Sequence, residues 1–267
     1  MRVTILGCGG SGGVPLADGT PGGNWGACDP SEPRNRRTRV SVLVEQHSGG
    51  GGTTLLIDAS PDLRQQILDR GVRRIDAVLF THAHADHCHG LDELRSVTRR
   101  TRRQIPAYMS AQTRALLAER FDYAFASSKS PDSLYPPLMD DRVIAGPTEI
   151  GGLTVIPFVQ DHGPETTLGF RIGGFAYSTD LVRLDEAGFE TLAGLQLWIV
   201  DALRERPHPT HSHIEQTLEW IERLRPARAV LTHMNHETDY QALLARCPDG
   251  VEPGYDGLTV DLDGVTV

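Results

Sequence analysis

Short apolar runs alternate with amphipathic stretches along the whole chain. The apolar runs predict strands near residues 2–7, 39–45, 53–58, 75–80, 153–160, 167–172, 175–179, 196–201, 228–232 and 258–262. Apolar positions at helical spacing predict helices near residues 61–70, 91–103, 110–119, 185–193, 213–224 and 238–245. This mixture predicts an α/β fold of two mixed sheets packed together with helices on their outer faces, an αββα sandwich.

Two of the predicted helices carry start or stop signals. Ser60 and Pro61 form an N-cap followed by proline at the first helical position, and Gly71 ends that helix. Ser212 and Glu215 have the spacing of a capping box at the start of a later helix. Both signals support the predicted helix boundaries.

The chain is expected to form one domain over residues 1–267, because no repeat or linker divides it. Residues 121–147 lack a regular pattern and are expected to form a flap or insertion over the functional site. The glycine-rich run over 48–52 lies between two predicted strands and predicts a flexible hairpin connection.

Composition narrows the class of protein. The 267 residues carry a net charge of −9, which disfavours a nucleic acid partner because proteins that coat nucleic acids are usually basic. The apolar runs are shorter than the roughly 20 residues of a membrane span, and no signal peptide precedes the first strand. Four scattered cysteines without a Cys-x-x-Cys motif suit a reducing compartment. We therefore expect a cytoplasmic protein with no membrane partner.

The segment from Thr81 to Gly90 places four histidines and an aspartate directly after an apolar run. Imidazole nitrogens and carboxylate oxygens are ligands of zinc-like and harder divalent metals. In an extended chain His82 and His84 face the same way and can hold one ion. A turn at Ala85 would then swing Asp86 and His87 toward a second ion. The alternative is a polar surface loop that happens to contain histidines.

The order His-x-His-x-Asp-His resembles the motif of the metallo-β-lactamase superfamily of dinuclear metal hydrolases. That family has a lone histidine, an aspartate and another histidine further along, each at the end of a strand. Here His162, Asp180 and His233 follow apolar runs in that order. The resemblance therefore extends over most of the chain and implies the αββα sandwich of that family.

The resemblance implies a ligand set for two divalent metal ions. His82, His84 and His162 would hold the first ion, Asp86, His87 and His233 would hold the second, and Asp180 would bridge them. Zinc, manganese or iron(II) suits these ligands. Two such ions can hold a hydroxide between them and neutralise a phosphodiester during in-line attack, and Asp86 is a candidate to orient that hydroxide.

His211 is the candidate that assists the leaving oxygen. It stands before Ser212 and His213, in a stretch that resembles the His-Ser-Thr segment of ribonuclease Z relatives, where a histidine assists the phosphate reaction. Ser212 matches that segment, whereas His213 replaces its threonine. The alternative is a surface histidine at the start of a helix.

The run from Gly7 to Gly12 fits the Gly-x-Gly-x-x-Gly dinucleotide pattern after a strand, but no helical periodicity follows it. We therefore expect a glycine-rich turn beside the metal site. The loop from Gly9 to Pro15, together with Cys28 and His236, resembles the cyclic phosphodiesterase of the carbon–phosphorus lyase pathway. This resemblance implies a small phosphate-containing substrate, a cyclic nucleotide- or phosphoribose-type diester.

That branch carries an additional structural zinc held by three cysteines and a histidine. Gly23 and Trp25 stand where two of those cysteines would be, so we expect no additional structural zinc. Other functions stay open: a tRNA 3′-end endonuclease of the ribonuclease Z type, a thioester or lactone hydrolase, or a non-catalytic metal-binding protein. A homodimer is common among the relatives.

Two further hypotheses concern residues near the site. Asp161, beside His162, and Asp58, at the end of a strand, are candidates to fix the tautomer of a metal-binding histidine. Arginines cluster at Arg34, Arg36, Arg37 and Arg39, and again at Arg95, Arg99, Arg100, Arg102 and Arg103. These clusters are either solvated surface or a means of drawing phosphate toward the metals.

Overall fold

The computed structural model describes residues 1–47, 51–125 and 136–262, and in this part the strands form two seven-stranded sheets. The first sheet has the order β14 (Thr259–Asp261), β1 (Arg2–Gly7), β2 (Ser41–Gln46), β3 (Thr53–Ile57), β4 (Ala77–Leu79), β5 (Ile105–Met109) and β6 (Met139–Val143). The second has the order β13 (Val251–Pro253), β12 (Arg228–Thr232), β11 (Leu197–Asp201), β10 (Phe175–Ser178), β9 (Glu165–Ile172), β8 (Leu153–His162) and β7 (Thr148–Ile150).

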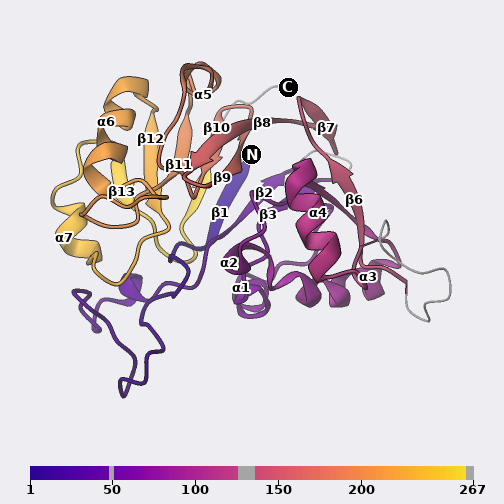
Figure 1. Cartoon of the computed structure of the whole chain (residues 1–267), viewed down its shortest axis with the longest axis horizontal. Coiled ribbons are helices and arrows are strands. Elements are labelled where there is room, and N and C mark those ends of the chain that lie inside the picture. The colour runs from indigo at the N-terminus through magenta and orange to yellow at the C-terminus, as the bar shows by residue number, and fades with distance from the viewer. Residues whose placement is uncertain (48–50, 126–135, 263–267) are drawn as a thin grey trace.

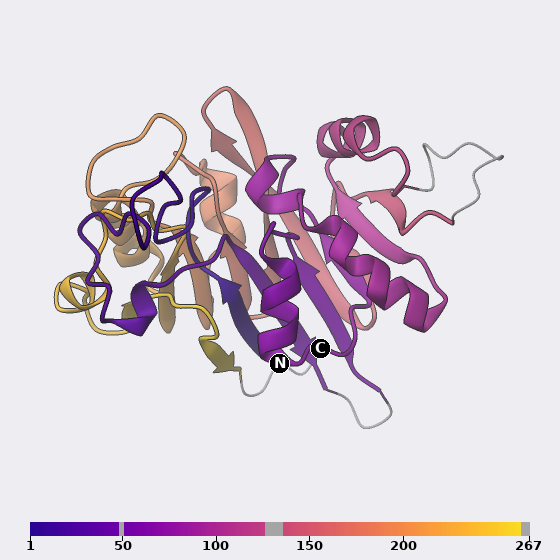
Figure 2. The same cartoon turned by 90° about the horizontal axis from the view of Figure 1, so that it is seen from below.

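Helices cover the outer faces of the two sheets (Figures 1 and 2). On the side of the first sheet lie α1 (Leu63–Arg70), α2 (Ala85–Cys88), α3 (Arg95–Thr101) and α4 (Ala111–Arg120). On the side of the second lie α5 (Glu186–Thr191), α6 (Ile214–Leu224) and α7 (Tyr240–Leu244). Short 3₁₀ turns occur at η1 (Pro33–Asn35) and η2 (Leu91–Leu94). The predicted αββα sandwich is confirmed.

Alternation along the strands builds two separate cores. In β2, Val42 and Val44 face the core between the sheets, whereas Leu43 faces the core under α1. The same alternation holds in β3, where Leu56 points to the helices. Because successive side chains of a strand point to opposite faces, an apolar run without polar positions forms a strand buried on both sides.

Strand direction determines where the chain delivers polar residues. β3 to β6 run parallel to one another, and so do β10 to β13. The carboxyl ends of parallel strands lie at one edge of a sheet, where loops can gather functional side chains.

The sequence missed several elements. β5 has a proline at its second position and β6 is mostly polar, so neither shows a clear strand pattern. β6 nevertheless pairs with β5 as the edge strand, and β7 and β13 are short edge strands of the second sheet. Residues 139–143 therefore belong to a sheet, which corrects the expected flap over 121–147 in that part. Residues 126–135 of the expected flap lie outside the described residues.

The helix signals were partly right. Gly71 ends α1 in a left-handed conformation, as predicted, but Asp62 rather than Ser60 precedes the first helical residue. The predicted capping box is wrong, because His213 is the N-cap of α6 and the Ser212 hydroxyl instead donates to the carbonyl of Asp201 at 2.7 Å.

The hairpin of β2 and β3 forms with the predicted strands, while residues 48–50 of its connection lie outside the described residues. After β1 no helix follows the glycine run, and the next element is η1, so the helix that dinucleotide binding needs is absent from residues 8–32. The chain makes a long excursion here, drawn in indigo in Figure 1, toward α7. Among the described helices, none combines the length and apolar character of a membrane span.

Candidate metal centre

The ends of β4, β8, β10 and β12 bring the predicted ligands to one place. His82 and His84 follow β4, and α2 carries the next two ligands. Asp180 and His233 lie just past their strands with φ of 55° and 58°. The left-handed region is unfavourable for residues with a Cβ atom, and such conformations gather at functional sites. Here they turn each chain sharply as it leaves the sheet.

All the predicted ligands converge. Their nitrogen and oxygen atoms fall into three groups in which every atom lies within 4.8 Å of the others: His82, His84, His162 and Asp180; Asp86, His87 and His233; and Asp180, Asp201, His211 and His233. Asp180 and His233 are each shared by two groups. This arrangement can hold two ions with Asp180 between them.

The spacing in the second group fits a shared ion. His87 Nε2 lies 3.1 Å from Asp180 Oδ1 and 3.4 Å from Asp86 Oδ2. His233 Nε2 lies 3.4 Å from Asp86 Oδ2 and 3.5 Å from Asp180 Oδ1. Two ligands at about 2.0–2.1 Å from a tetrahedral zinc ion lie roughly 3.3 Å apart. These side chains therefore already have the spacing of a coordination shell.

The first group is slightly wider. His82 Nε2 and His162 Nε2 lie 3.7 Å and 3.8 Å from Asp180 Oδ2. The ring of His84 packs 4.4 Å from that of His82, and its side chain is 43% exposed, so this group opens to solvent. Within the described residues, the buried Nε2 atoms of His82 and His87 have no hydrogen-bond partner. Buried polar atoms without partners are costly, and a metal ion would satisfy both.

Hydrogen bonds at Nδ1, the ring nitrogen that faces away from the centre, orient three of the histidines. Nδ1 of His87 donates to Asp58 Oδ2 at 2.7 Å, and Nδ1 of His162 donates to the carbonyl of Thr210 at 2.7 Å. The hydroxyl of Thr81 donates to Asp58 at 2.9 Å and lies 3.0 Å from Nδ1 of His82. Each contact leaves Nε2 as the free lone pair that faces the centre.

The structure thus separates the two proposed supporting carboxylates. Asp58 holds His87, as the sequence suggested. Asp161 does not contact the ring of His162, because it pairs with Arg183 at 2.9 Å and accepts from the amide of Gly163. Adjacent positions in a strand point to opposite faces, so a neighbour in sequence is a poor candidate to support a side chain.

Charge is concentrated at this centre. Burial alone would raise the pKa of Asp180, but the imidazoles of His233, His87 and His82 hold it well below its usual value. Burial alone would lower the pKa of His233, but Asp180 and the hydrogen bond that His233 donates to Asp86 raise it to about 9. Nearby carboxylates outweigh burial and raise the pKa of His87 as well, whereas burial lowers the pKa of His82 and of His162. Without metal, His87 and His233 thus carry protons that balance the carboxylates, and metal ions would replace those protons.

His211 lies beside both groups. Its ring stacks on that of His233 with centroids 4.7 Å apart, and its Nε2 lies 3.8 Å from Asp180 Oδ2. Nδ1 of His211 donates to Asp201 Oδ2 at 2.9 Å. Asp201 is fully buried and was missed by the sequence analysis. Its signal was its position at the end of an apolar strand, the same context that identified Asp180.

A cavity of about 190 Å³ opens over the centre and is also lined by Ser11 and Glu165. Glu165 Oε1 lies 3.5 Å from His84 Nε2 and was also missed, because it falls within a predicted loop. An adjoining cavity of about 700 Å³ shares Pro164 and Glu165 with the first. Ser11 places the glycine-rich turn beside the site, as expected.

No arginine is among the residues that line the metal cavity within the described part of the chain. In the first arginine cluster, Arg34 and Arg36 stack on aromatic rings, Arg37 is buried and Arg39 pairs with Asp62. In the second, Arg95 pairs with a neighbouring aspartate and the others line different cavities. The hypothesis that arginines draw phosphate onto the metals therefore finds no support here.

Cys28 is occupied by the backbone. Its thiol donates to the carbonyls of Thr238 at 3.3 Å and His236 at 3.4 Å, and the buried guanidinium of Arg37 lies 3.9 Å from its sulfur. The expectation of no additional structural zinc stays a prediction.

Comparisons with known proteins agree with this architecture. The family model described as Beta-lactamase superfamily domain matches residues 53–234. An octanoyltransferase of Porphyromonas gingivalis is 34% identical over 98% of this chain but only 52% of its own length. The chain thus spans about half the length of that relative.

Two solved structures are similar over nearly the whole chain. A diphosphatase from the PhnP family is 32% identical with a TM-score of 0.85, over 98% of each chain. Zinc-bound PqqB from Methylobacterium extorquens is 25% identical with a TM-score of 0.70, over 98% of this chain and 100% of that one. The first of these similarities supports a hydrolase. Since the family model covers most of the sequence and the sandwich fold agrees with it, the chain belongs to the beta-lactamase superfamily and has the metallo-β-lactamase fold.

Proposed function

We propose that this protein is a dinuclear metal-dependent phosphoric diester hydrolase that acts on a small cyclic nucleotide- or phosphoribose-type diester. The observation that carries the proposal is the pair His211 and Asp201, placed against a ligand set for two ions. A protein that only binds metal needs the metal ligands and nothing more. A further histidine that is held in a fixed orientation beside the ligands is needed only for proton transfer.

The residues divide the work. His82, His84 and His162 would hold one ion, and Asp86, His87 and His233 the other, with Asp180 shared. When bound, two such ions neutralise phosphate oxygens and supply a nucleophile from water. Their donor set of imidazoles and carboxylates accommodates zinc, manganese or iron(II).

His211 serves the leaving oxygen. Asp201 accepts the proton of its Nδ1, so Nε2 is the atom that faces the cavity. The carboxylate stabilises the ring when Nε2 is protonated, and that proton can pass to the departing oxygen. The hydrogen bond to Asp201 also keeps the ring in place. The His211 side chain is 12% exposed, so it can reach a bound substrate.

The cavities favour a small substrate. The 190 Å³ space over the centre can take the reacting phosphate with part of a sugar, and the adjoining 700 Å³ space can take the remainder. Three carboxylates border that larger space, those of Asp161, Glu165 and Asp185, together with Arg183, which is paired with Asp161. Because the cavity has no unpaired positive charge among its described lining residues, we expect it to receive an uncharged part of the substrate.

Hydrolysis of bis(p-nitrophenyl) phosphate by the metal-loaded protein tests this proposal. We expect turnover that requires zinc or manganese and is lost after chelation and in His84→Ala. His211→Ala should lower kcat by roughly 10²–10³-fold while both metals stay bound, since general acid catalysis contributes on that order. His47→Ala is the matched control, because His47 is exposed and lines neither cavity.

Two results would count against the proposal. If His211→Ala loses metal but keeps its turnover per bound ion, the histidine is a ligand rather than an acid. If two metals bind and a thioester or lactone is hydrolysed while phosphate diesters are not, the centre acts on carbonyl groups instead.

A second candidate reaction is cleavage of a diphosphate bond. It is favoured by the similarity to a diphosphatase over almost the whole chain. The same residues would act, since the leaving group is again an oxygen on phosphorus. Comparing kcat/KM for a diphosphate diester and a phosphate diester distinguishes the two reactions.

A further inference from the structure

The arginines without partners gather in one region of the molecule. Most arginines of the described residues make ion pairs, hydrogen bonds or aromatic contacts. Those with no such contact are Arg64, Arg70, Arg73, Arg99, Arg100, Arg102, Arg103 and Arg225. All but Arg64 and Arg225 line one series of three cavities. In a protein with a net charge of −9, this concentration of unpaired positive charge is a local feature.

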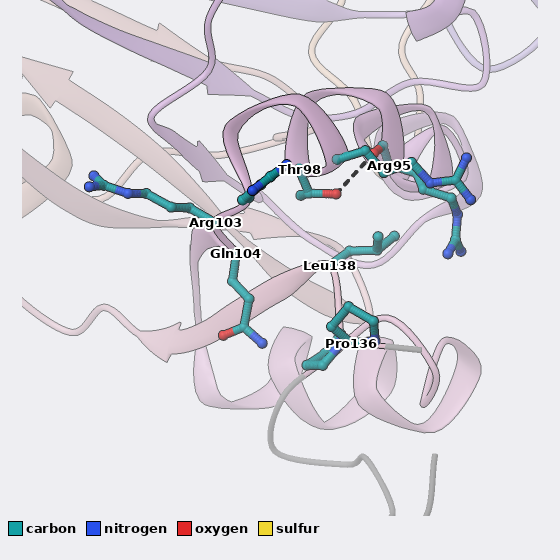
Figure 3. Close-up of a pocket in the computed structure, with 9 residues that line it drawn as sticks. Arg95, Thr98, Arg103, Gln104, Pro136 and Leu138 are labelled. Atoms are coloured by element: carbon teal, nitrogen blue, oxygen red, sulfur yellow. Dashed lines mark hydrogen bonds between the residues drawn. The ribbon is translucent and has the colours of Figure 1, made fainter. Parts of the chain in front are cut away.

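The three cavities are neighbours that share lining residues. The first, of about 330 Å³, runs along α3 and is shown in Figure 3. It shares Arg103 and Gln104 with the second, of about 740 Å³. The second shares Arg73 and Arg74 with the third, of about 360 Å³. In Figure 3 the side chain of Arg103 extends away from the first cavity. We refer to the three together as the arginine groove.

The arginine groove lies at the edge of the first sheet opposite the metal centre. Arg73 and Arg74 precede β4, and Arg103 precedes β5, so they lie at the amino ends of parallel strands. The metal ligands follow the carboxyl end of β4. At about 3.3 Å per residue the chain covers roughly 20 Å between the two places. A ligand in the arginine groove is therefore separate from a substrate at the metals.

The walls combine charge with apolar surface. Pro136, Pro137 and Leu138 line the first cavity, and Ile105 and Pro106 line the second. Among the residues that the structure describes, the carboxylates that border the groove are those of Asp76 and Glu45, and Asp76 is paired with Arg74. Guanidinium groups bind phosphate through two parallel hydrogen bonds, which makes phosphate the anion that suits these side chains.

We propose that the arginine groove binds the backbone of a single-stranded nucleic acid. A row of cavities that share lining residues suits a flexible chain better than the broad surface of a folded acidic protein. A nucleic acid combines phosphates with less polar sugars and bases, which matches walls that combine arginines with apolar residues. Inorganic polyphosphate has phosphates but no sugars or bases that could contact the apolar walls. Within the described part of the chain the lining residues include no aromatic side chain, so the binding should depend on phosphate contacts, which carry no base sequence information.

Binding of a fluorescent oligodeoxythymidine to the metal-loaded protein tests this proposal, with the oligonucleotide checked for intactness afterwards. Arg73 and Arg103 each line two of the cavities, so the double variant Arg73→Gln/Arg103→Gln should weaken binding roughly tenfold or more. The plot of log affinity against log salt concentration should become shallower by about 1.4, because the double variant loses two phosphate contacts at about 0.7 each for a single strand. The matched control is Arg64→Gln/Arg225→Gln, which removes the same charge from exposed, unpartnered arginines outside the groove.

The proposal is independent of the reaction at the metals. Turnover of bis(p-nitrophenyl) phosphate should be unchanged in Arg73→Gln/Arg103→Gln, and a loss of turnover would contradict a separate site. Equal weakening in both double variants, or no binding by the wild type at low salt, would overturn the proposal. Tighter binding of inorganic polyphosphate or poly-glutamate, compared at equal charge, would assign the groove to those polyanions instead.

Discussion

Asp58 shows how much one buried residue contributes to the metal centre. Its carboxylate accepts from the amide and the hydroxyl of Thr81 and from Nδ1 of His87, and it is fully buried. These three donors together occupy both carboxylate oxygens of Asp58. The carboxylate therefore both fixes the ring of His87 and raises its basicity as a ligand.

We predict that Asp58→Asn weakens metal binding by about 10–100-fold, the usual effect of losing such a supporting group. An asparagine has one acceptor oxygen, so its amide would face a donor. Competition with a chromogenic chelator measures the affinity. Asp161→Asn is the control, because Asp161 neighbours His162 in sequence without touching its ring. Equal losses in the two variants would mean that Asp58 has no particular role.

At the scale of elements, an ion pair joins the segment before β2 to the start of α1. Arg39 Nε and Nη2 donate to the two oxygens of Asp62 at 2.7 Å and 2.5 Å, and the amide of Arg39 donates to the same carboxylate at 2.9 Å. Burial alone would raise the pKa of Asp62, but the hydrogen bonds from Arg39 outweigh it and hold the pKa below its usual value. The pair thus stabilises the fold when Asp62 is ionised.

Asp62→Asn should lower the free energy of unfolding by about 1–2 kcal/mol at neutral pH, which is below the roughly 1.5–3 kcal/mol of hydrogen bonds to charged groups because solvent screens this partly exposed pair. Because the folded pKa is depressed, this contribution is complete above the unfolded pKa of about 4 and is lost as the pH falls through the folded value. Urea unfolding at several pH values measures the effect. The exposed pair of Arg2 and Asp261 provides the control Asp261→Asn, for which a smaller loss is expected. A difference that persists in strong acid would contradict this assignment.

At the scale of the whole molecule, charge is divided between two opposite sides of the sandwich. On one side the two sheets together contribute the buried carboxylates of Asp58, Asp86, Asp180 and Asp201 with their histidines. The opposite side carries the arginine groove. The net charge of −9 is a sum over the whole chain, so it does not reveal that negative and positive groups gather in separate regions.

Removing the metals should destabilise the entire fold. The buried carboxylates would then be balanced only by the protonated rings of His87 and His233. For metals held at a thousand times their Kd, linkage gives about 4 kcal/mol, which corresponds to a fall of Tm by roughly 10 °C in a domain of this size. Calorimetry with and without chelator measures the shift. The variant His82→Ala/His233→Ala should show no response to chelator, and a chelator-insensitive wild type would mean that the metals do not stabilise the fold.

The sequence by itself determined the sandwich and the candidate ligands. Short apolar runs bounded by turn residues indicated the strands, and polar residues directly after them were expected at a sheet edge. The order of His162, Asp180 and His233 after such runs, by its resemblance to the metallo-β-lactamase motif, identified them as candidate ligands. The strand β6 could not be predicted, because an edge strand is half exposed and its Met-Asp-Asp-Arg-Val sequence has no apolar pattern.

Only the tertiary structure decided which neighbours act together. Asp201 comes within 2.9 Å of His211 because α6 packs back against the end of β11, and no local pattern encodes that contact. The arginines of α3 resembled a means of guiding phosphate to the metals, since they follow the motif in sequence. The helix instead carries them to the amino ends of the parallel strands, so that residues close in the chain lie at opposite edges of the sheet. Periodicity reports the burial of each element, whereas the path of the chain between elements determines which side chains meet.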